Sequence, residues 1–201
     1  MLHKKNGFTL FEVLIVIAIL GAVLAIGLPR FNRGQTNIKK IIRELGALSK
    51  EVRHYSRLKN TTHRIVFDME GSPHQYWVEV ADGPRLVRSQ EKEEAEIKAI
   101  EESKDSENKV TSAFRKSDKL LKDGRKLPDS LQIKQVEVKS RPEPITKGKA
   151  YVHFTAEGLV DQAVVQITDG KQLTWSLIFN PLTGHADIVE KPVSLKDLEV
   201  Q

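Results

Sequence analysis

The stretch KNGFTLFEVLIVIAILGAVLAIGLP, residues 5–29, decides the architecture of this 201-residue chain. Its last 17 residues carry no charge, and after Lys5 the only ionisable side chain in the stretch is Glu12. The 22 residues from Phe8 to Pro29 would form a helix about 33 Å long at about 1.5 Å per residue. This length matches the hydrocarbon core of a bilayer, which is about 30 Å thick. The sequence therefore predicts a transmembrane helix over residues 8–29.

Glu12 is the unusual residue of this helix. A carboxylate at the centre of a membrane helix costs at least about 2.5–3.5 kcal/mol, and less near one end. Glu12 lies one helical turn from Phe8, because positions i and i+4 share a face. If the chain were cut after Gly7, Phe8 would carry a cationic amine beside this carboxylate, and an adjacent copy could supply the amine instead. Charge neutralisation in a low dielectric would then explain the buried acid.

Two other interpretations of the N-terminus remain open from the residues alone. In a secretory signal peptide, Lys4 and Lys5 would form the charged region, residues 13–22 the apolar region, and residues 23–25 the small-residue cleavage site. In a plain signal anchor, the same helix would stay in the membrane uncut. Neither interpretation gives Glu12 a purpose.

The ten residues KNGFTLFEVL, 5–14, resemble the class III leader of type IV pilins and type II secretion pseudopilins. The resemblance implies a prepilin leader at 1–7, cleavage by prepilin peptidase between Gly7 and Phe8, and N-methylation of Phe8. It also implies that Glu12 pairs with the N-terminal amine of a neighbouring subunit during assembly. Phe11 departs mildly from the pattern, which more often has Leu or Ile at that position.

Pro29 closes the apolar segment, and two outcomes are open there. A proline inside a helix removes one hydrogen bond and bends the helix, so Pro29 either kinks a continuous helix or ends the membrane helix. The pilin resemblance implies a bend or a melted turn that serves the packing of subunits.

Residues 30–60 are predicted to continue the helix in amphipathic form, ending at Asn60. Apolar residues recur there at steps of three and four, which predicts a stripe that packs on a sheet. The stripe consists of Ile38, Ile41, Ile42, Leu45, Leu48, Val52, Tyr55 and Leu58. The opposite face is basic and is expected to be solvated, with Lys39, Lys40, Arg43, Lys50, Arg53 and Arg57.

Residues 61–88 and 127–201 have the pattern of a β-rich head. Short β-branched and alternating runs are separated by turn signals, and the break in alternation between Ile133 and Val136 predicts a bulge. Gly158, Gly170 and Gly184 are expected in tight turns that need positive φ. Residues 150–190 are predicted to form an antiparallel meander or the edge of a sandwich. The predicted fold class is therefore α+β and pilin-like, with a long N-terminal helix packed on an antiparallel head.

Residues 89–126 differ in composition from the rest of the head. They hold 20 charged residues in 38, ten acidic and ten basic, with the acids concentrated in the first half. We interpret this segment as a solvated charged insertion that is partly helical.

The C-terminal half resembles the GspH/FimT family. The resemblance rests on the Phe154-x-x-x-Gly158 turn and on a strand ending in Thr183-Gly184. It implies a minor pseudopilin of a type II secretion system. Its partners would be prepilin peptidase, the major and other minor pseudopilins, the inner-membrane platform of the secretion system and the inner membrane. The alternatives are a FimT-like minor pilin of a type IV pilus with a role in DNA uptake, and a plain membrane-anchored β-rich binding protein.

The expected location is the inner membrane, crossed once, and the pseudopilus after assembly. Lys4 and Lys5 favour a cytoplasmic N-terminus, although basic residues also follow the span. The resemblance places the C-terminal head in the periplasm.

The composition argues against catalysis and against cofactors. The chain has no cysteine, which excludes disulfides, thiol nucleophiles and thiolate metal sites. Its six histidines form no local ligand pair, and no nucleophile elbow or phosphate loop is present. The net charge of +5 is mild, so nucleic acid is not expected as a partner. We therefore predict a protein that is not an enzyme and that holds no metal or cofactor.

Overall fold

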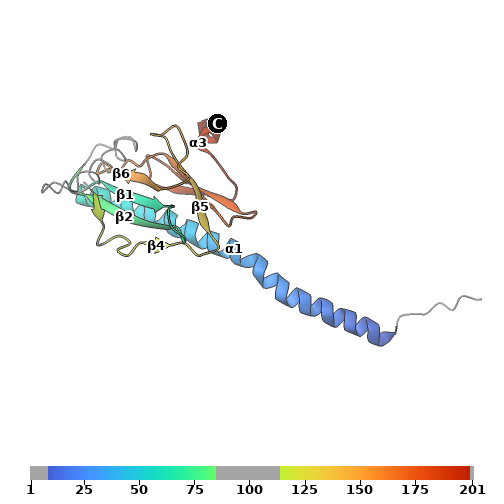
Figure 1. The fold of residues 1–201 in the computed structure, drawn as a ribbon. Helices are drawn as coiled ribbons and strands as arrows, with labels where there is room; N and C mark the ends of the chain where they lie inside the picture. Colours follow the sequence, from blue (N-terminus) through green and yellow to red (C-terminus); the bar gives the residue numbers. More distant parts are fainter. Residues whose placement is uncertain (1–8, 85–113, 200–201) are drawn as a thin grey trace, which may run out of the picture.

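A single helix, α1 (Leu10–Lys59), organises the protein. The structure is a computed structural model that describes residues 9–84 and 114–199, with the backbone alone over residues 24–34. Thr9 caps the helix N-terminus, and its hydroxyl accepts a hydrogen bond from the Glu12 backbone N–H at 3.3 Å. Asn60 ends the helix in the left-handed conformation, at φ 50°. The N-terminal half of α1 extends away from the head, and its C-terminal half lies along the sheets (Figure 1).

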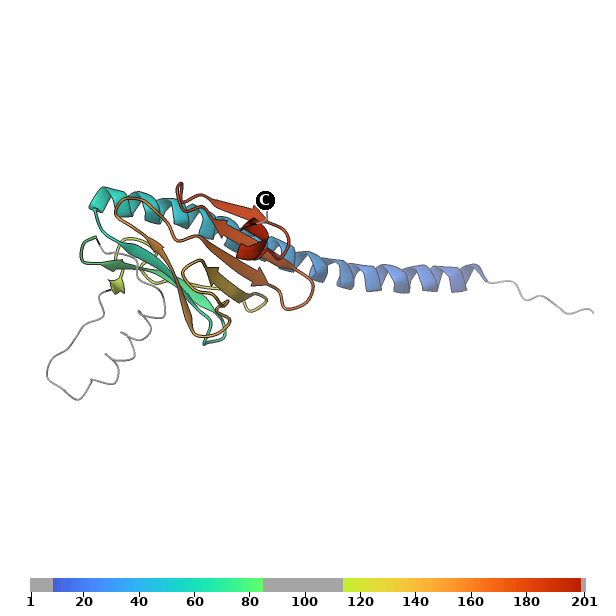
Figure 2. The same cartoon turned by 90° about the horizontal axis from the view of Figure 1, so that it is seen from above.

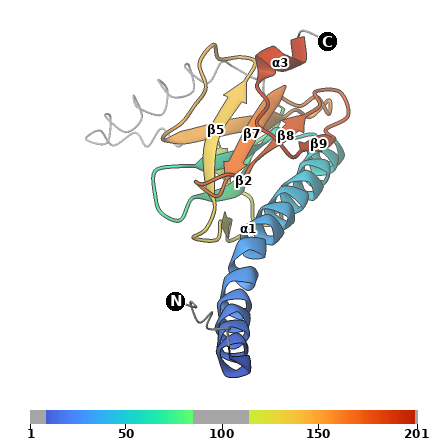
Figure 3. The same cartoon turned by 90° about the vertical axis from the view of Figure 1, so that its right-hand side faces the viewer.

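The helix continues through Pro29, so the possibility that this residue ends the membrane helix is wrong. Proline removes one hydrogen bond from the ladder, and its fixed φ is compatible with a helix. Figure 3 shows the N-terminal and C-terminal halves of α1 running in different directions. The assignment of a kink to Pro29 itself stays a prediction.

The amphipathic half of α1 packs as its periodicity predicts, except at its end. The buried positions are Ile38, Ile41, Ile42, Leu45, Leu48 and Val52. Tyr55 is half-buried against the core, and Leu58 is 63% exposed. The prediction that Leu58 belongs to the apolar stripe is therefore wrong. Each step of three residues falls short of a 3.6-residue turn by about 60°, so Tyr55 and then Leu58 rotate away from the sheets.

The first sheet has β1 (His63–Asp68) at its centre. Its order is β3-β2-β1-β6, with β2 (Gln75–Ala81), β3 (Phe114–Lys116) and β6 (Lys149–Phe154). A short strand, β4 (Arg125–Lys126), also pairs with β2. All these pairs are antiparallel. Strands β1 and β2 thus form an antiparallel hairpin.

The second sheet has the order β5-β7-β8-β9. Its strands are β5 (Gln132–Val138), β7 (Ala163–Thr168), β8 (Thr174–Phe179) and β9 (Ala186–Val189). The register of β5 shifts between Ile133 and Gln135, which confirms the predicted bulge. The inner faces of both sheets and the buried stripe of α1 form one core. Figures 2 and 3 show the second sheet beside the helix, in a different layer from the first.

Residues 150–190 do not form a single meander, so the first of the two predicted alternatives, meander or sandwich edge, is wrong. Strand β6 pairs with β1 in the first sheet, and only β7, β8 and β9 follow one another in the second. Five of the six β6 residues are buried. A strand covered on both faces carries no alternation, so its sequence does not reveal which neighbour it joins.

The prediction of a solvated, partly helical insertion over 89–126 is wrong in part for residues 114–126, which are mostly exposed but form the short strands β3 and β4 and no helix. Phe114 and Arg125 lie in strands paired with β2, and Leu120 is 1% exposed. The guanidinium of Arg125 lies 3.6 Å from the Glu44 carboxylate, which connects β4 to the helix. A few apolar side chains such as Leu120, which is part of the core, are therefore enough to fix residues 114–126 against the first sheet despite their many charges. The remaining residues of the predicted insertion, 89–113, lie outside the described residues, so the proposed domain division stays a prediction there.

The C-terminal segment crosses the outer face of the second sheet. Gln166 donates from Nε2 to the Val193 carbonyl at 2.8 Å, and Ser176 donates from Oγ to the Lys191 carbonyl at 2.8 Å. The Glu137 carboxylate accepts from the backbone N–H of Leu195 at 2.8 Å, where the short helix α3 (Leu195–Glu199) begins. Buried polar side chains on this face are thus satisfied by the passing backbone.

His63 joins the end of α1 to the first strand. Its side chain is 3% exposed, and its Nδ1 lies 3.0 Å from the Ser56 hydroxyl. Burial lowers the pKa of His63 from its ordinary value, and a hydrogen bond with the Thr61 backbone opposes this shift. The folded protein therefore holds His63 neutral at a pH where the unfolded chain would protonate it.

This pKa shift predicts a pH-dependent stability. Because the folded pKa is lowered, the contribution of His63 is fully present above about pH 6.5 and is lost as the pH falls toward the folded pKa. We expect the free energy of unfolding of the wild type to fall, relative to that of His63→Gln, between pH 7.5 and pH 5. Denaturant unfolding of both chains across this range measures the difference. A difference that does not change with pH would contradict the assignment.

Candidate functional site

Residues 10–23 of α1 present apolar side chains in every direction. Their exposed fractions lie between 44% and 82% for Leu10, Phe11, Val13, Leu14, Ile15, Val16, Ile17, Ile19, Leu20 and Val23. This part of the helix stands clear of the head (Figures 1 and 2). A contiguous apolar surface of this kind marks a contact with other proteins or with a membrane. No helix among the residues that the structure describes is long and apolar enough to cross a membrane.

Glu12 is the one acid on this apolar surface over residues 10–23. It lies in the first turn of α1, where the positive end of the helix dipole favours a carboxylate. Its backbone N–H is held by Thr9, at 3.3 Å from the hydroxyl and 3.1 Å from the carbonyl. Among the described residues no cation pairs with its side chain. The carboxylate is therefore positioned at the helix start and is open to a partner from outside.

The predicted site residues fall into two groups. Gly7 and Phe8, the predicted cleavage and methylation residues, lie outside the described residues. Glu12 and Pro29 both lie in α1, separated by more than four helical turns. The roles assigned to these four residues stay predictions.

Two turns of the head are fastened to the basic side of α1. Arg53 donates from Nε to the Gly158 carbonyl at 2.7 Å and from Nη2 to the Leu182 carbonyl at 2.8 Å. Ser49, one turn earlier, donates from Oγ to the Gly184 carbonyl at 2.8 Å. The prediction that Arg53 belongs to a solvated face is therefore wrong, since its side chain is half-buried and bonded to both turns.

The two turn glycines make room for arginine side chains. Gly158 has φ +89° and Gly184 has φ +63°, which confirms the predicted positive φ at both. A Cβ added at Gly158 would lie 2.5 Å from Cδ of Arg57, and a Cβ added at Gly184 would collide with Cδ of Arg53. The sequence signal for this contact is the pair of arginines one helical turn apart, Arg53 and Arg57, together with the two turn glycines that leave room for them.

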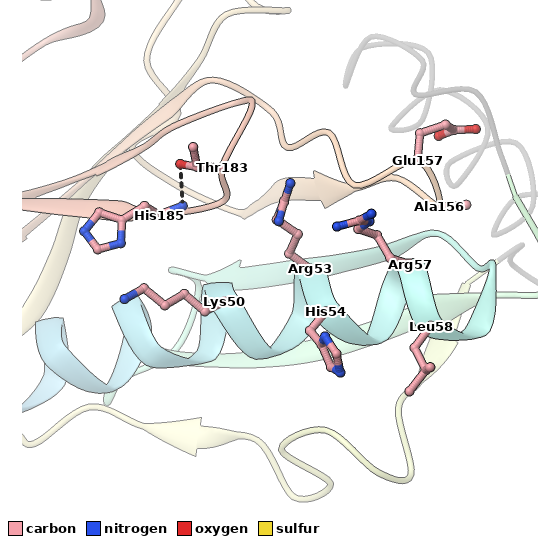
Figure 4. A pocket seen from close by; sticks show the side chains of 9 residues that line it. All are labelled: Lys50, Arg53, His54, Arg57, Leu58, Ala156, Glu157, Thr183 and His185. Atoms are coloured by element: carbon pink, nitrogen blue, oxygen red, sulfur yellow. Dashed lines mark hydrogen bonds between the residues drawn. The ribbon is translucent and has the colours of Figure 1, made fainter.

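These residues line a groove of about 840 Å³ between α1 and the two turns (Figure 4). Its lining consists of Lys50, Arg53, His54, Arg57, Leu58, Ala156, Glu157, Thr183 and His185. Figure 4 shows Arg53 and Arg57 leaving α1 on the side of the turns. The groove is thus rich in cationic side chains.

The outer face of the first sheet carries a buried polar cluster. Arg64 lies opposite Glu79 across the strands, with Nη2 at 2.8 Å from the carboxylate. Its guanidinium lies over the rings of Phe114 and Tyr151, at 4.0 and 4.1 Å from their centres. Such stacking with a paired guanidinium stabilises a sheet surface.

His153 is the neighbouring strand residue in this cluster. It is 1% exposed, and its Nδ1 lies 2.8 Å from the Asp161 carboxylate. His153 is therefore a packed strand residue. Within the described ranges, 9–84 and 114–199, no group of three histidine or carboxylate side chains could hold a metal ion.

Comparison with known proteins assigns the N-terminal segment. Residues 2–28 match the family described as "Prokaryotic N-terminal methylation motif". No curated protein and no solved structure matches the chain significantly. The motif is a type IV pilin-like prepilin signal, so the class indicated is that of the pilins and pseudopilins in general. Such a signal indicates processing by prepilin peptidase, assembly with other pilins and a membrane-anchored N-terminus with the head outside.

The junction between turns and helix yields a stability prediction. Gly184→Ala combines a left-handed conformation, which disfavours alanine by about 1–2 kcal/mol, with a collision against Arg53 that adds about 1–2 kcal/mol. At Gly170 the conformation is also left-handed, at φ +72°, but the nearest atom to an added Cβ is the end of the Gln132 side chain, at 3.4 Å. We expect Gly184→Ala to lower the free energy of unfolding clearly more than Gly170→Ala does. Denaturant unfolding measures both, and equal losses would show that Arg53 does not press on the turn.

Proposed function

We propose that this protein is a minor pseudopilin of a type II secretion system, of the GspH/FimT family. One observation carries the proposal: a prepilin methylation signal leads into a helix that is apolar on all sides and has a single positioned acid, Glu12, in its first turn. The helix is built for burial among other helices or lipids, because the head covers none of its first 14 residues.

The proposed mechanism is assembly rather than catalysis. Prepilin peptidase cuts between Gly7 and Phe8, and the new amine of Phe8 is methylated. Before assembly, the processed subunit resides in the inner membrane with its N-terminus on the cytoplasmic side and its head in the periplasm. It then enters the pseudopilus through its apolar helix, beside the major and other minor pseudopilins and above the inner-membrane platform.

Glu12 sets the register of this assembly. In the low dielectric of a helix bundle, an unpaired carboxylate is strongly disfavoured, and a paired one is tolerated. The Phe8 amine of a neighbouring subunit is the cation that the mechanism supplies. A subunit displaced along the filament would lose this pair, so the pair selects one axial position.

The head supports the assignment to the GspH/FimT family. The Phe154-to-Gly158 turn and the Thr183-Gly184 corner are the positions that Arg53 and Ser49 fasten to α1. The motif residues of the resemblance are therefore also the residues that attach the head to the assembly helix. Movement of the helix would be transmitted to the head at these two turns.

The second candidate is a FimT-like minor pilin of a type IV pilus that takes part in DNA uptake. The cationic groove is the observation that favours it. The C-terminal tail does not, since Lys191 and Lys196 are balanced by Asp197 and Glu199. The Asp197 carboxylate accepts hydrogen bonds from the Ser194 backbone N–H at 2.7 Å and from the Ser194 hydroxyl at 2.9 Å. These uncharged donors leave the negative charge of Asp197 in place.

Processing tests the proposal at the N-terminus. We expect the mature chain in the membrane fraction to begin at N-methylated Phe8, and Gly7→Val to leave the full chain uncut. N-terminal sequencing and mass spectrometry of the intact protein distinguish the outcomes. A mature chain that starts at Ile26 would indicate an ordinary signal peptide, and an uncut wild type would indicate a plain anchor.

Assembly tests the role of Glu12. We expect Glu12→Leu to be processed normally and to enter the pseudopilus at least about tenfold less than the wild type, because the neighbouring amine would lose its buried partner. Cross-linking to neighbouring subunits, followed by quantification in sheared filaments, measures incorporation. Glu51→Leu, which removes an exposed acid in the head half of the same helix, serves as the matched control. Normal incorporation of Glu12→Leu would refute the assigned role.

A further inference from the structure

The cationic groove between α1 and the two turns has no function in the assembly mechanism above. Its permanent cations, Lys50, Arg53 and Arg57, come from one side of the helix, at spacings of three and four residues. His185 lies across from them on the Thr183-Gly184 corner, where its backbone N–H is bonded to the Thr183 hydroxyl at 3.1 Å. We propose that this groove binds an acidic polypeptide segment of a partner protein.

The charges of the groove are not neutralised from within. Among the described residues no carboxylate forms an ion pair with Lys50, Arg53 or Arg57. The one acid in the lining is Glu157, which is an exposed residue. Three adjacent cations with one rim acid create a positive potential that attracts carboxylates and repels other cations.

Arg53 is arranged as an anion-binding group. A guanidinium has five N–H donors, and Arg53 uses one on the Gly158 carbonyl and one on the Leu182 carbonyl. These carbonyls are uncharged, so they fix the orientation of the guanidinium without cancelling its charge. Three donors remain, and a guanidinium presents its donors in the fork geometry that suits a carboxylate.

Arg57 lies against the Gly158 turn, to which Arg53 also donates. Its aliphatic chain lies so close to Gly158 that an added Cβ would stand 2.5 Å from Cδ. Arg57 is an exposed residue. Ordering of the Arg53 side chain by its two hydrogen bonds before a ligand arrives lowers the entropy lost on binding, which is the usual benefit of preorganisation.

The lining favours a polypeptide over a nucleic acid. One acid, Glu157, belongs to the lining, and a second, Asp187, lies outside it with its carboxylate 3.6 Å from Nε2 of His185. They would repel a polymer that carries a phosphate at every unit, whereas a peptide can place its carboxylates against the arginines and its neutral residues against the rim. The groove also includes the apolar side chains of Leu58 and Ala156, which suit peptide side chains.

The test measures binding of a labelled hexaglutamate peptide to the full-length chain in detergent micelles. We expect salt-dependent binding at low ionic strength and no binding of hexaglutamine. The double variant Lys50→Gln, Arg57→Gln should weaken binding about tenfold, since each partly exposed ion pair contributes modestly, and it leaves the Arg53 hydrogen bonds in place. Lys171→Gln removes an exposed cation from the turn between β7 and β8, at the end of these strands away from the groove. This variant should bind the peptide as the wild type does.

Controls keep the outcome decisive. Thermal unfolding of each variant checks that the head is folded, and Lys50→Gln alone, at an exposed position, should weaken binding about threefold if the double variant does not fold. Absence of hexaglutamate binding, or equal binding by the groove variants, would overturn the proposal. Tighter binding of single-stranded oligothymidylate than of the peptide, lost in the same variants, would assign the groove to nucleic acid instead. None of these outcomes depends on cleavage at Gly7 or on Glu12, so the assembly proposal is tested separately.

Discussion

The attachment of two head turns to one helix is the constraint on which this structure depends. Arg53 and Ser49 donate side-chain hydrogen bonds to carbonyls of the Gly158 and Leu182–Gly184 turns, at 2.7 to 2.8 Å. These turns connect the first sheet to the second and β8 to β9, so one helical segment orients both sheets. The glycines are required because a side chain would displace the arginine stems. Packing of Ile38, Ile42 and Leu45 under the same sheets then closes the core.

This arrangement gives the two parts of α1 different surroundings. The C-terminal half is covered by the head on its apolar stripe, and residues 10–23 are apolar apart from Glu12 and exposed in all directions. Apolar surface of that extent is stable only when it is covered by lipid or by other helices. The head leaves residues 10–23 uncovered, and Glu12 is the one charged residue among them.

The sequence predicted local structure better than pairing. The amphipathic stripe, the end of the helix at Asn60, the bulge after Ile133 and the positive-φ glycines all depend on neighbours within a few residues, where periodicity and turn chemistry act. The partner of β6 and the inclusion of residues 114–126 in the first sheet depend on contacts between distant segments. A fully buried strand has no alternation to read, and a charge-rich segment hides its few anchors, so both predictions failed.

The sequence by itself determined that an N-terminal prepilin signal precedes an apolar helix with one acid, because hydrophobicity and charge are properties of the residues in order. It also contained the glycines and the arginines of the groove. Only the tertiary structure decided that Arg53 and Arg57 face Gly158 and Gly184, since the helix and the turns are about a hundred residues apart in the chain. The fold places the cations Lys50, Arg53 and Arg57 side by side without an acid paired to them among the described residues. The basic helix face, which was predicted to be solvated, thereby becomes one wall of a cationic groove.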